Sequence, residues 1–366
     1  MASRWWAGVK EFLRPSSAPD RAVPAMDGAF APNDQLDELT EAIATHDPQD
    51  VVHYRDEVVL VAAGQQIEAI DIGDHSRRVV AELPGLVTGI HVTSGDVLAC
   101  VDGHGLVRVD IESGAVSTLS VDERAHRLSA VVELDGRIFA TSYAAEGTWY
   151  DWPRDLMTKG ASGALLEVQE DGSLRTLADG LAWAYGLCVA ADGTLLFTES
   201  WRHRVCTYDL SSGRTGTLRE RLPGYPARIH AGSDGELLLT MFAARTQLVE
   251  FVLREDEYRT RMMNEIPMDD WVTPAFRKTG SIRAPFQLGG AVHLGEVKPW
   301  APSRSYGLVA VLDAAGDVRL SAHSRAGGVR HGITASCAVA DRLVLACYGT
   351  SELLVGAIDM ESRMIS

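Results

Sequence analysis

The sequence has few basic residues and no cluster of them. The chain of 366 residues carries 34 Lys and Arg against 50 Asp and Glu, which gives a formal net charge of −16 at pH 7. An acidic surface repels nucleic acid and anionic lipid unless its cations are gathered in one place. No stretch holds a run of Lys or Arg. The sequence therefore predicts no nucleic-acid partner, and it does not favour a membrane as partner.

Long apolar runs are also absent. No eighteen consecutive residues are apolar, so no membrane-spanning helix is expected. Charged residues interrupt the apolar ones in residues 1–15, which excludes the continuous apolar core of an export signal. These features predict a cytoplasmic protein. Apolar residues at helical spacing in the same segment predict a short helix that docks on the body of the protein. A membrane-surface helix and a homodimer contact are the alternatives.

Cysteines are few and are not arranged for a special role. The five of them are widely spaced in strand-like runs without a CxxC pair, and we expect reduced core residues. The motifs GxSxG, GxxxxGK[ST], GxGxxG and HExxH do not occur in a supporting context. Histidines from separate repeats, without a local pair of ligands, do not predict a zinc site. The sequence thus predicts no cofactor and no metal site. The histidines considered are His46, His126, His230 and His331.

A repeated pattern is the strongest feature that is present. Short β-branched runs alternate with Gly/Asp turns at a spacing of roughly 40 residues. Each unit reads as strand, tight turn and strand, so neighbouring strands are antiparallel. Six such sheets close into a ring that leaves no long exposed edge, and the sequence predicts an all-β fold, a six-bladed β-propeller. The units begin at residues 53, 91, 131, 188, 230 and 337.

Three segments depart from the repeat. Residues 1–44 read as an N-terminal helix and an extended arm that becomes helical at 33–44, followed by a propeller over 45–366. Aromatic-rich insertions of about 144–162 and 252–305 interrupt blades 3 and 5. Because insertions of this length exceed ordinary turns, we expect them to cover one mouth of the ring like a lid, above a ligand pocket.

The stretches 180–210, 221–242 and 306–349, together with 25–34, resemble the strictosidine synthase-like proteins. That family lies within the superfamily of six-bladed propellers that includes gluconolactonase, regucalcin and the paraoxonases. The resemblance implies a pocket at the mouth under the insertions. It also implies, for the hydrolases of the superfamily, a calcium ion held by Glu, Asn, Asn and Asp. The matching positions here hold His46, Leu128, Tyr185 and Ala227. Hard cations prefer oxygen ligands, so these residues argue against a calcium-dependent hydrolase.

The resemblance also bears on the choice of catalytic residues. The glutamate that strictosidine synthases use as acid and base falls at or beside Gly332, which makes strictosidine synthesis itself a poor expectation. Tyr185 and the neighbouring His331 are the predicted catalytic residues, because both can transfer protons. A hydrogen-bonded turn histidine and a tyrosine that fills the channel remain the alternatives.

Six further residues are predicted to bind substrate. Aromatic side chains of the first insertion can stack on a planar or hydrophobic ligand, or else pack against one another within the lid. Arg228 can hold a carboxylate, or else form a salt bridge with an acidic neighbour such as Glu199. Glu199 can act as a buried acid or belong to the scaffold. The predicted substrate-binding residues are His46, Tyr143, Trp149, Trp183, Glu199 and Arg228.

The sequence leaves three functions open. The first is a metal-independent strictosidine synthase-like enzyme that performs condensation, cyclisation, isomerisation or lyase chemistry on an organic small molecule by proton transfer. The second is a calcium-dependent lactonase or esterase. The third is a non-catalytic propeller that binds a small molecule after loss of its catalytic site.

Overall fold

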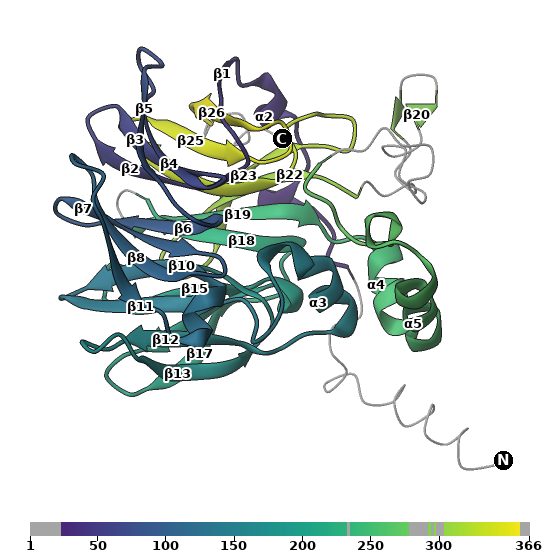
Figure 1. The fold of residues 1–366 in the computed structure, drawn as a ribbon. Helices are drawn as coiled ribbons and strands as arrows, with labels where there is room; N and C mark the ends of the chain where they lie inside the picture. Colours follow the sequence, from purple (N-terminus) through teal and green to yellow (C-terminus); the bar gives the residue numbers. More distant parts are fainter. Residues whose placement is uncertain (1–22, 233–234, 278–291, 294–295, 298–303, 359–366) are drawn as a thin grey trace.

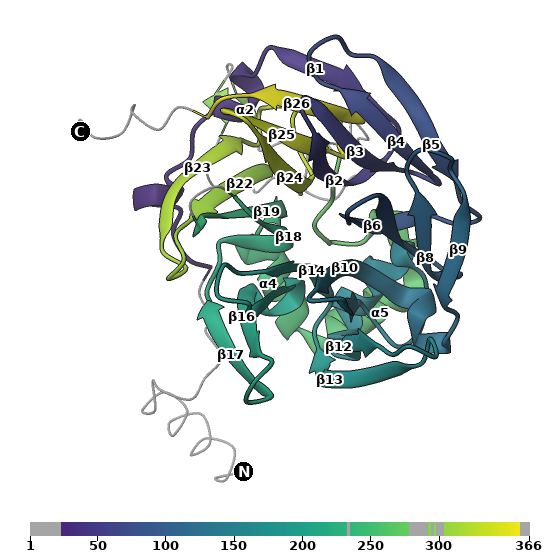
Figure 2. The same cartoon turned by 90° about the vertical axis from the view of Figure 1, so that its left-hand side faces the viewer.

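The computed structural model describes residues 23–232, 235–277, 292–293, 296–297 and 304–358. Six four-stranded antiparallel sheets surround a central axis, as Figure 2 shows from one end of that axis. The predicted all-β, six-bladed propeller is confirmed. The N-terminal apolar stripe, and with it the proposed dimer contact, lies outside the described residues.

Each blade begins with the strand nearest the axis. The blades are numbered 1 to 6 in chain order of these inner strands. Blade 1 contains β2 (Pro48–Arg55), β3 (Val58–Ala63), β4 (Gln66–Asp71) and β5 (Arg77–Glu82). Blade 2 contains β6 (Val87–Val92), β7 (Asp96–Val101), β8 (Gly105–Asp110) and β9 (Val116–Ser120). Blade 3 contains β10 (Leu128–Leu134), β11 (Arg137–Ser142), β12 (Gly163–Val168) and β13 (Leu174–Leu181). Blade 4 contains β14 (Ala184–Val189), β15 (Leu195–Glu199), β16 (Arg204–Asp209) and β17 (Arg214–Arg219). Blade 5 contains β18 (Gly224–Ala231), β19 (Leu237–Ala244), β22 (Gly307–Leu312) and β23 (Val318–Ser324). Blade 6 contains β24 (Ile333–Val339), β25 (Arg342–Cys347), β26 (Glu352–Gly356) and β1 (Glu41–Ala44).

Local sequence explains the hairpins. Asp135 and Gly136 join β10 to β11 with positive φ angles of 52° and 75°, the conformation of a two-residue turn that Asp-Gly favours. The strands that such turns connect are rich in Val, Ile and Leu, and their inward residues are buried between neighbouring blades. The five cysteines are buried and free, as predicted.

Blade 6 is completed by the N-terminal arm. Strand β1 pairs with β26, so that Glu41 lies opposite Val355. The predicted helix over 33–44 is therefore wrong: only α2 (Gln35–Glu38) is helical, and the chain is extended again at its C-cap, Leu39. The predicted boundary at 44/45 also separates β1 from its blade. The arm is extended because its backbone groups pair with β26, which gives blade 6 the same four strands as the other blades.

The two insertions lie on one face of the ring, to the right in Figure 1. The first lies between β11 and β12, as predicted, and forms a 3₁₀ turn, η3 (Trp149–Asp151), and α3 (Trp152–Thr158). The second starts directly after β19, before the predicted residue 252, and forms α4 (Gln247–Arg254), α5 (Asp256–Glu265) and η6 (Met268–Asp270). These elements are called the lid here. A two-stranded ribbon, β20 (Val292–His293) and β21 (Glu296–Val297), belongs to the same insertion. Further 3₁₀ turns occur elsewhere in the chain as η1 (Gly28–Phe30), η2 (Glu123–Arg127) and η4 (Ser200–Arg202).

Hydroxyl groups tie neighbouring blades together around the axis. At five of the six blade junctions a Ser or Thr hydroxyl donates to a backbone carbonyl of the next inner strand. At the junction of blades 1 and 2 the bond runs the other way, because the Ile90 amide donates to Asp50 Oδ2 at 3.0 Å. Asp50 therefore introduces a negative charge into an otherwise neutral ring of contacts. The five hydroxyls belong to Thr88, Ser129, Thr198, Thr240 and Thr334.

Among the described residues no helix is both long and apolar enough to cross a membrane.

Candidate functional site

Aromatic side chains fill the lid-side mouth of the ring. They form one continuous cluster, the aromatic plug, in which neighbouring ring centroids lie 4.5–6.4 Å apart. The plug joins inner-strand residues to residues of the lid. Its members are Tyr143, Trp149, Trp152, Trp183, Tyr185, Trp201, Tyr225, Phe242 and Phe276.

Four predicted site residues belong to this plug. Tyr143, Trp149, Trp183 and Tyr185 lie together, and each is at most 4% exposed. The Tyr143 hydroxyl donates to Asp102 at 2.6 Å, while the Tyr185 hydroxyl has no hydrogen-bond partner among the described residues. Burial raises the pKa of Tyr185 above its ordinary value, so its phenol stays protonated. The structure brings these residues together as predicted, but they fill the mouth where a pocket was expected.

The open space lies further along the axis. A cavity of about 530 Å³ is lined by all six inner strands and reaches residues at their ends, such as Leu134 and Val189. Because the inner strands start on the lid face, their ends lie on the opposite face, the one toward the viewer in Figure 2. The predicted pocket under the lid is thus corrected to a cavity entered from the other side. Its polar lining comes from Asp50, His53, His91, Glu133, Arg228 and His230.

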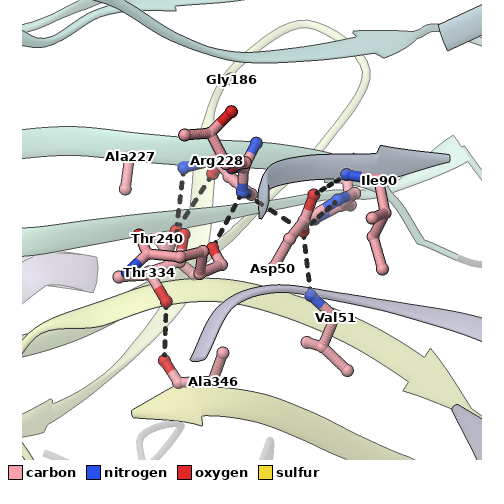
Figure 3. Close-up of polar contacts among 12 residues, drawn as sticks. Asp50, Val51, Ile90, Gly186, Ala227, Arg228, Thr240, Thr334 and Ala346 are labelled. Atoms are coloured by element: carbon pink, nitrogen blue, oxygen red, sulfur yellow. Dashed lines mark hydrogen bonds and ion pairs between the residues drawn. The ribbon is translucent and has the colours of Figure 1, made fainter. Parts of the chain in front are cut away.

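A buried ion pair closes the inner end of this cavity. Arg228 Nε lies 3.2 Å from Asp50 Oδ1, and each side chain is 2% exposed (Figure 3). The Asp50 carboxylate also accepts the amides of Val51, at 2.9 Å, and Ile90. Arg228 follows Ala227 in a two-residue bulge of β18, between Pro226 and Ile229, and this bulge gives the inner strand room to turn a long side chain across the axis.

Close packing of two inner strands fixes the place of this bulge. A Cβ atom added to Gly186 of β14 would lie 2.7 Å from the Cα of Arg228 and 2.8 Å from the carbonyl oxygen of Ala227. Only glycine fits that approach, so Gly186 lets blades 4 and 5 meet closely where Tyr185 and Arg228 reach the axis.

Two neutral histidines stand beside the ion pair. Burial and, to a smaller extent, the neighbouring His230 lower the pKa of His91 to about 4, against the opposing effect of Asp50. Burial also lowers the pKa of His230, although its Nε2 lies 3.5 Å from Asp50 Oδ1. Both imidazoles are therefore uncharged at pH 7. An uncharged imidazole next to a carboxylate can accept a proton and keep it stabilised.

The cysteines of the cavity are poor nucleophiles. Cys188 and Cys337 line its wall, and burial raises the pKa of both thiols, that of Cys188 to about 12. Since the thiolate is the reactive form, the histidines and the carboxylate are the better candidates for chemistry.

Three predicted site residues lie outside both the aromatic plug and the cavity. In His331, Nδ1 is hydrogen bonded to Ser305 Oγ at 2.8 Å and Nε2 to the Arg325 carbonyl at 2.9 Å, and the ring is fully buried. This is the hydrogen-bonded turn histidine of the alternative interpretation. The geometry does not support the catalytic role predicted for His331.

Glu199 and His46 also differ from the prediction. Both oxygens of the buried Glu199 are engaged, one with Arg202 and the Ala182 amide and the other with Arg204. The alternative of a salt bridge from Arg228 to an acidic neighbour is confirmed, but the partner is Asp50 and not the suggested Glu199. The His46 side chain is 81% exposed and lies 3.8 Å from Asp47. Glu199 thus has the scaffold role, and His46 lies on the surface.

Sequence reasoning missed Asp50 and the site role of His91 and His230. The available signal was the segment PQDVVHY, in which a carboxylate precedes β-branched residues of an inner strand. A charged residue at a buried strand position needs a partner, and Arg228 was the one cation already assigned to the channel.

The residues at the four implied ligand positions do not fit calcium. Leu128 and Ala227 are buried apolar residues, and the guanidinium of Arg228 adjoins the position of Ala227. A hard divalent cation needs several oxygen donors and is repelled by a neighbouring positive charge. Within the described ranges, no three His, Cys, Asp or Glu side chains come together in an arrangement that would hold a metal ion.

The buried neutral His91 predicts a specific pH dependence of stability. Unfolded chains protonate histidine below about pH 6.5, whereas folded His91 stays neutral down to about pH 4. Stability is therefore expected to fall as the pH is lowered through this window, by up to about 3 kcal/mol from this group. In the His91→Asn variant, the free energy of unfolding measured with urea should fall less between pH 7 and pH 4.5 than it does in the wild type. His53→Asn, at the cavity rim, is the control. If the stability of His91→Asn and of the wild type changes with pH in the same way, His91 is not the source of the pH dependence.

Comparison with known proteins agrees with this architecture. The family model of the SMP-30/gluconolactonase/LRE-like region matches residues 54–236, half of the chain, and the protein belongs to this family. A gluconolactonase of Xanthomonas campestris superposes with a TM-score of 0.55 at 13% identity, covering 94% of this chain and 98% of that one. The calcium-binding regucalcin of Agrobacterium tumefaciens superposes with a TM-score of 0.51 at 11% identity, covering 84% and 85%. At these identities the superpositions show a shared fold and nothing about function.

A sequence relative covers part of the chain. The adipocyte plasma membrane-associated protein of Salmo salar is 27% identical in an alignment 252 residues long that covers 61% of this chain. The match spans 60% of the length of that relative. The comparisons support the gluconolactonase and regucalcin part of the resemblance, while the strictosidine synthase-like assignment stays a prediction.

Proposed function

We propose that the protein is a hydrolase of small lactones or esters that works in the axial cavity without calcium. Membership of the gluconolactonase family favours this reaction class over condensation or lyase chemistry. The observation that carries the proposal is the position of the neutral His230 beside Asp50 and Arg228 in one cavity. A cavity of about 530 Å³ has the size typical of sites for small organic molecules.

The residues suit a general-base mechanism. His230 takes a proton from water while the water oxygen bonds to the carbonyl carbon of the substrate. The Asp50 carboxylate, 3.5 Å away, stabilises the resulting imidazolium. The positive charge of the Arg228 guanidinium, which stays paired with Asp50, lies on the same cavity wall and favours negative charge on the carbonyl oxygen through space. The bond to the leaving oxygen then breaks, and His230 returns the proton to that oxygen, which yields an acid and an alcohol.

The cavity favours uncharged substrates. Arg228 is already paired with Asp50, so the described lining leaves no unpaired cation for a substrate carboxylate. The carboxylate of Glu133, on the same wall, lies 3.7 Å from Arg108. The remaining wall is largely Val, Leu, Ile and Ala.

The test measures hydrolysis of a panel of neutral lactones and aryl esters by pH-stat titration. The protein is assayed before and after dialysis against a chelator. We expect turnover that the chelator leaves unchanged within about twofold, because the base and the stabilising positive charge belong to side chains. Loss of activity with the chelator, restored by calcium, would instead support the calcium-dependent hydrolase.

A non-catalytic binding propeller is the second candidate. The aromatic plug favours it, since the mouth under the lid is filled by side chains. Saturable binding of a small molecule without turnover of any lactone or ester would support this function. Condensation or lyase chemistry through Tyr185 and His331 has less support, because both nitrogens of His331 are hydrogen bonded.

A further inference from the structure

Oxygen atoms from two blades converge on the guanidinium of Arg228. Its Nε donates to the Gln49 carbonyl at 3.1 Å, and its Nη2 donates to the Thr88 carbonyl. The Asp50 carboxylate lies 3.2 Å from Nε. We call the Gln49 carbonyl, the Thr88 carbonyl and the Asp50 carboxylate the axial cage. They come from β2 and β6, while Arg228 comes from β18 on blade 5.

An aromatic ring faces the same cation from another blade. The Cζ atom of Arg228 lies 5.4 Å from the ring centroid of Tyr185 on blade 4. This is within the range of an attractive cation–π contact. One buried side chain of blade 5 thereby contacts residues of blades 1, 2 and 4.

The axial cage has the chemistry of a cation site. Backbone carbonyls and a carboxylate are the donors that hard cations use in proteins. The Asp50 carboxylate and the Arg228 guanidinium are almost completely removed from solvent, so the charge of Asp50 depends on a nearby positive group. The two carbonyls likewise need a donor or a cation to satisfy them.

These contacts differ from the metal site that the sequence resemblance implied. The implied ligands were side chains at positions 46, 128, 185 and 227, whereas the axial cage uses residues 49, 50 and 88. The positive charge in the channel is covalently part of the chain.

We infer that the axial cage is a cation-binding site that the protein fills with its own Arg228 guanidinium. The charge that holds blades 1, 2, 4 and 5 together at the axis is thus built in, and external metal adds nothing to the stability of the wild type. Truncation of Arg228 opens the cage to a small free cation. The cation can be guanidinium, which has the planar shape of the removed arginine head group, or calcium, which suits the oxygen donors.

The experiment is thermal unfolding of the full chain carrying Arg228→Ala, without additive and with low-millimolar guanidinium chloride, calcium chloride or sodium chloride at matched ionic strength. The variant should lose on the order of 10 °C in Tm, because its buried carboxylate is left unpaired. Guanidinium or calcium at ten times its dissociation constant should restore roughly 3 °C, and the wild type should not respond.

Two further variants control for general effects. Arg245→Ala removes another buried arginine, whose Nε lies 3.0 Å from Glu250, and it should be destabilised without selective recovery by guanidinium or calcium. The double variant Asp50→Asn/Arg228→Ala removes both charges, so it should be more stable than Arg228→Ala and insensitive to cations. If Arg228→Ala alone does not fold, the double variant decides, because a role in packing alone predicts no recovery from Asp50→Asn.

Two results would overturn the inference. One is a wild-type protein that calcium stabilises, since its cage would then not be filled. The other is a folded Arg228→Ala protein that neither guanidinium nor calcium stabilises beyond sodium chloride. Because the readout is Tm, failure of the proposed hydrolysis leaves this test intact.

Discussion

Replacing His230 with glutamine is expected to lower kcat/KM for the best lactone substrate by about 100- to 10,000-fold, the usual contribution of a general base. Glutamine keeps a polar group beside Asp50 but cannot accept and return a proton. The measurement is initial-rate kinetics on protein whose Tm matches the wild type within a few degrees. Because burial lowers the pKa of His230, the acid limb of the wild-type pH profile should lie below pH 6.5.

His53→Gln is the matched control for this prediction. His53 lines the same cavity, but its Nε2 is hydrogen bonded to the Asp56 carbonyl at 3.0 Å, near the rim. Its replacement should leave kcat nearly unchanged. Equal losses in both variants would remove His230 from the role of base, as would full activity in His230→Gln.

Trp149→Ala should destabilise the protein by about 3–5 kcal/mol, the usual cost of removing a large buried aromatic side chain. Trp149 is 4% exposed, and its ring lies 5.0–5.8 Å from those of Tyr143, Trp183 and Tyr185. Its Nε1 also donates to Gln49 Oε1 at 3.1 Å, so the change leaves a buried amide oxygen without that donor. Urea unfolding followed by circular dichroism gives the free energy directly.

The neighbouring residue provides the control. Tyr150 lies in the same 3₁₀ turn but is 52% exposed, and Tyr150→Ala should change the free energy of unfolding by less than about 0.5 kcal/mol. Similar effects for the two substitutions would mean that the plug contributes little to stability and that the lid is loosely attached. Trp149→Ala would then be the variant in which to look for ligand entry from the lid side.

The blades could be predicted because their signals are local. Turns such as Asp135-Gly136 and the β-branched runs beside them define each hairpin within a few residues. Strand β1 could not be found in this way. Its pairing partner β26 is distant in sequence, and the short segment Glu41–Ala44 carries no turn that would reveal it.

The candidate site was predictable only in part, for a related reason. The inner-strand positions of Tyr185 and Arg228 follow from the repeat, and both reach the channel. The partner of Arg228 depends on how blades 1 and 5 face each other across the axis, and no local pattern encodes this. The filling of the lid-side mouth depends likewise on the packing of residues such as Trp149 against Tyr185.

Pairing of Glu41 with Val355 has a consequence for biosynthesis. On the ribosome, β1 emerges among the first strands, yet the edge that it occupies appears only after β26 has been translated. At typical elongation rates of roughly 5–20 residues per second, the nascent ring stays open for tens of seconds. Throughout that interval the first and last blades of the unsealed circle expose apolar faces that the finished ring buries, which favours association between newly made chains.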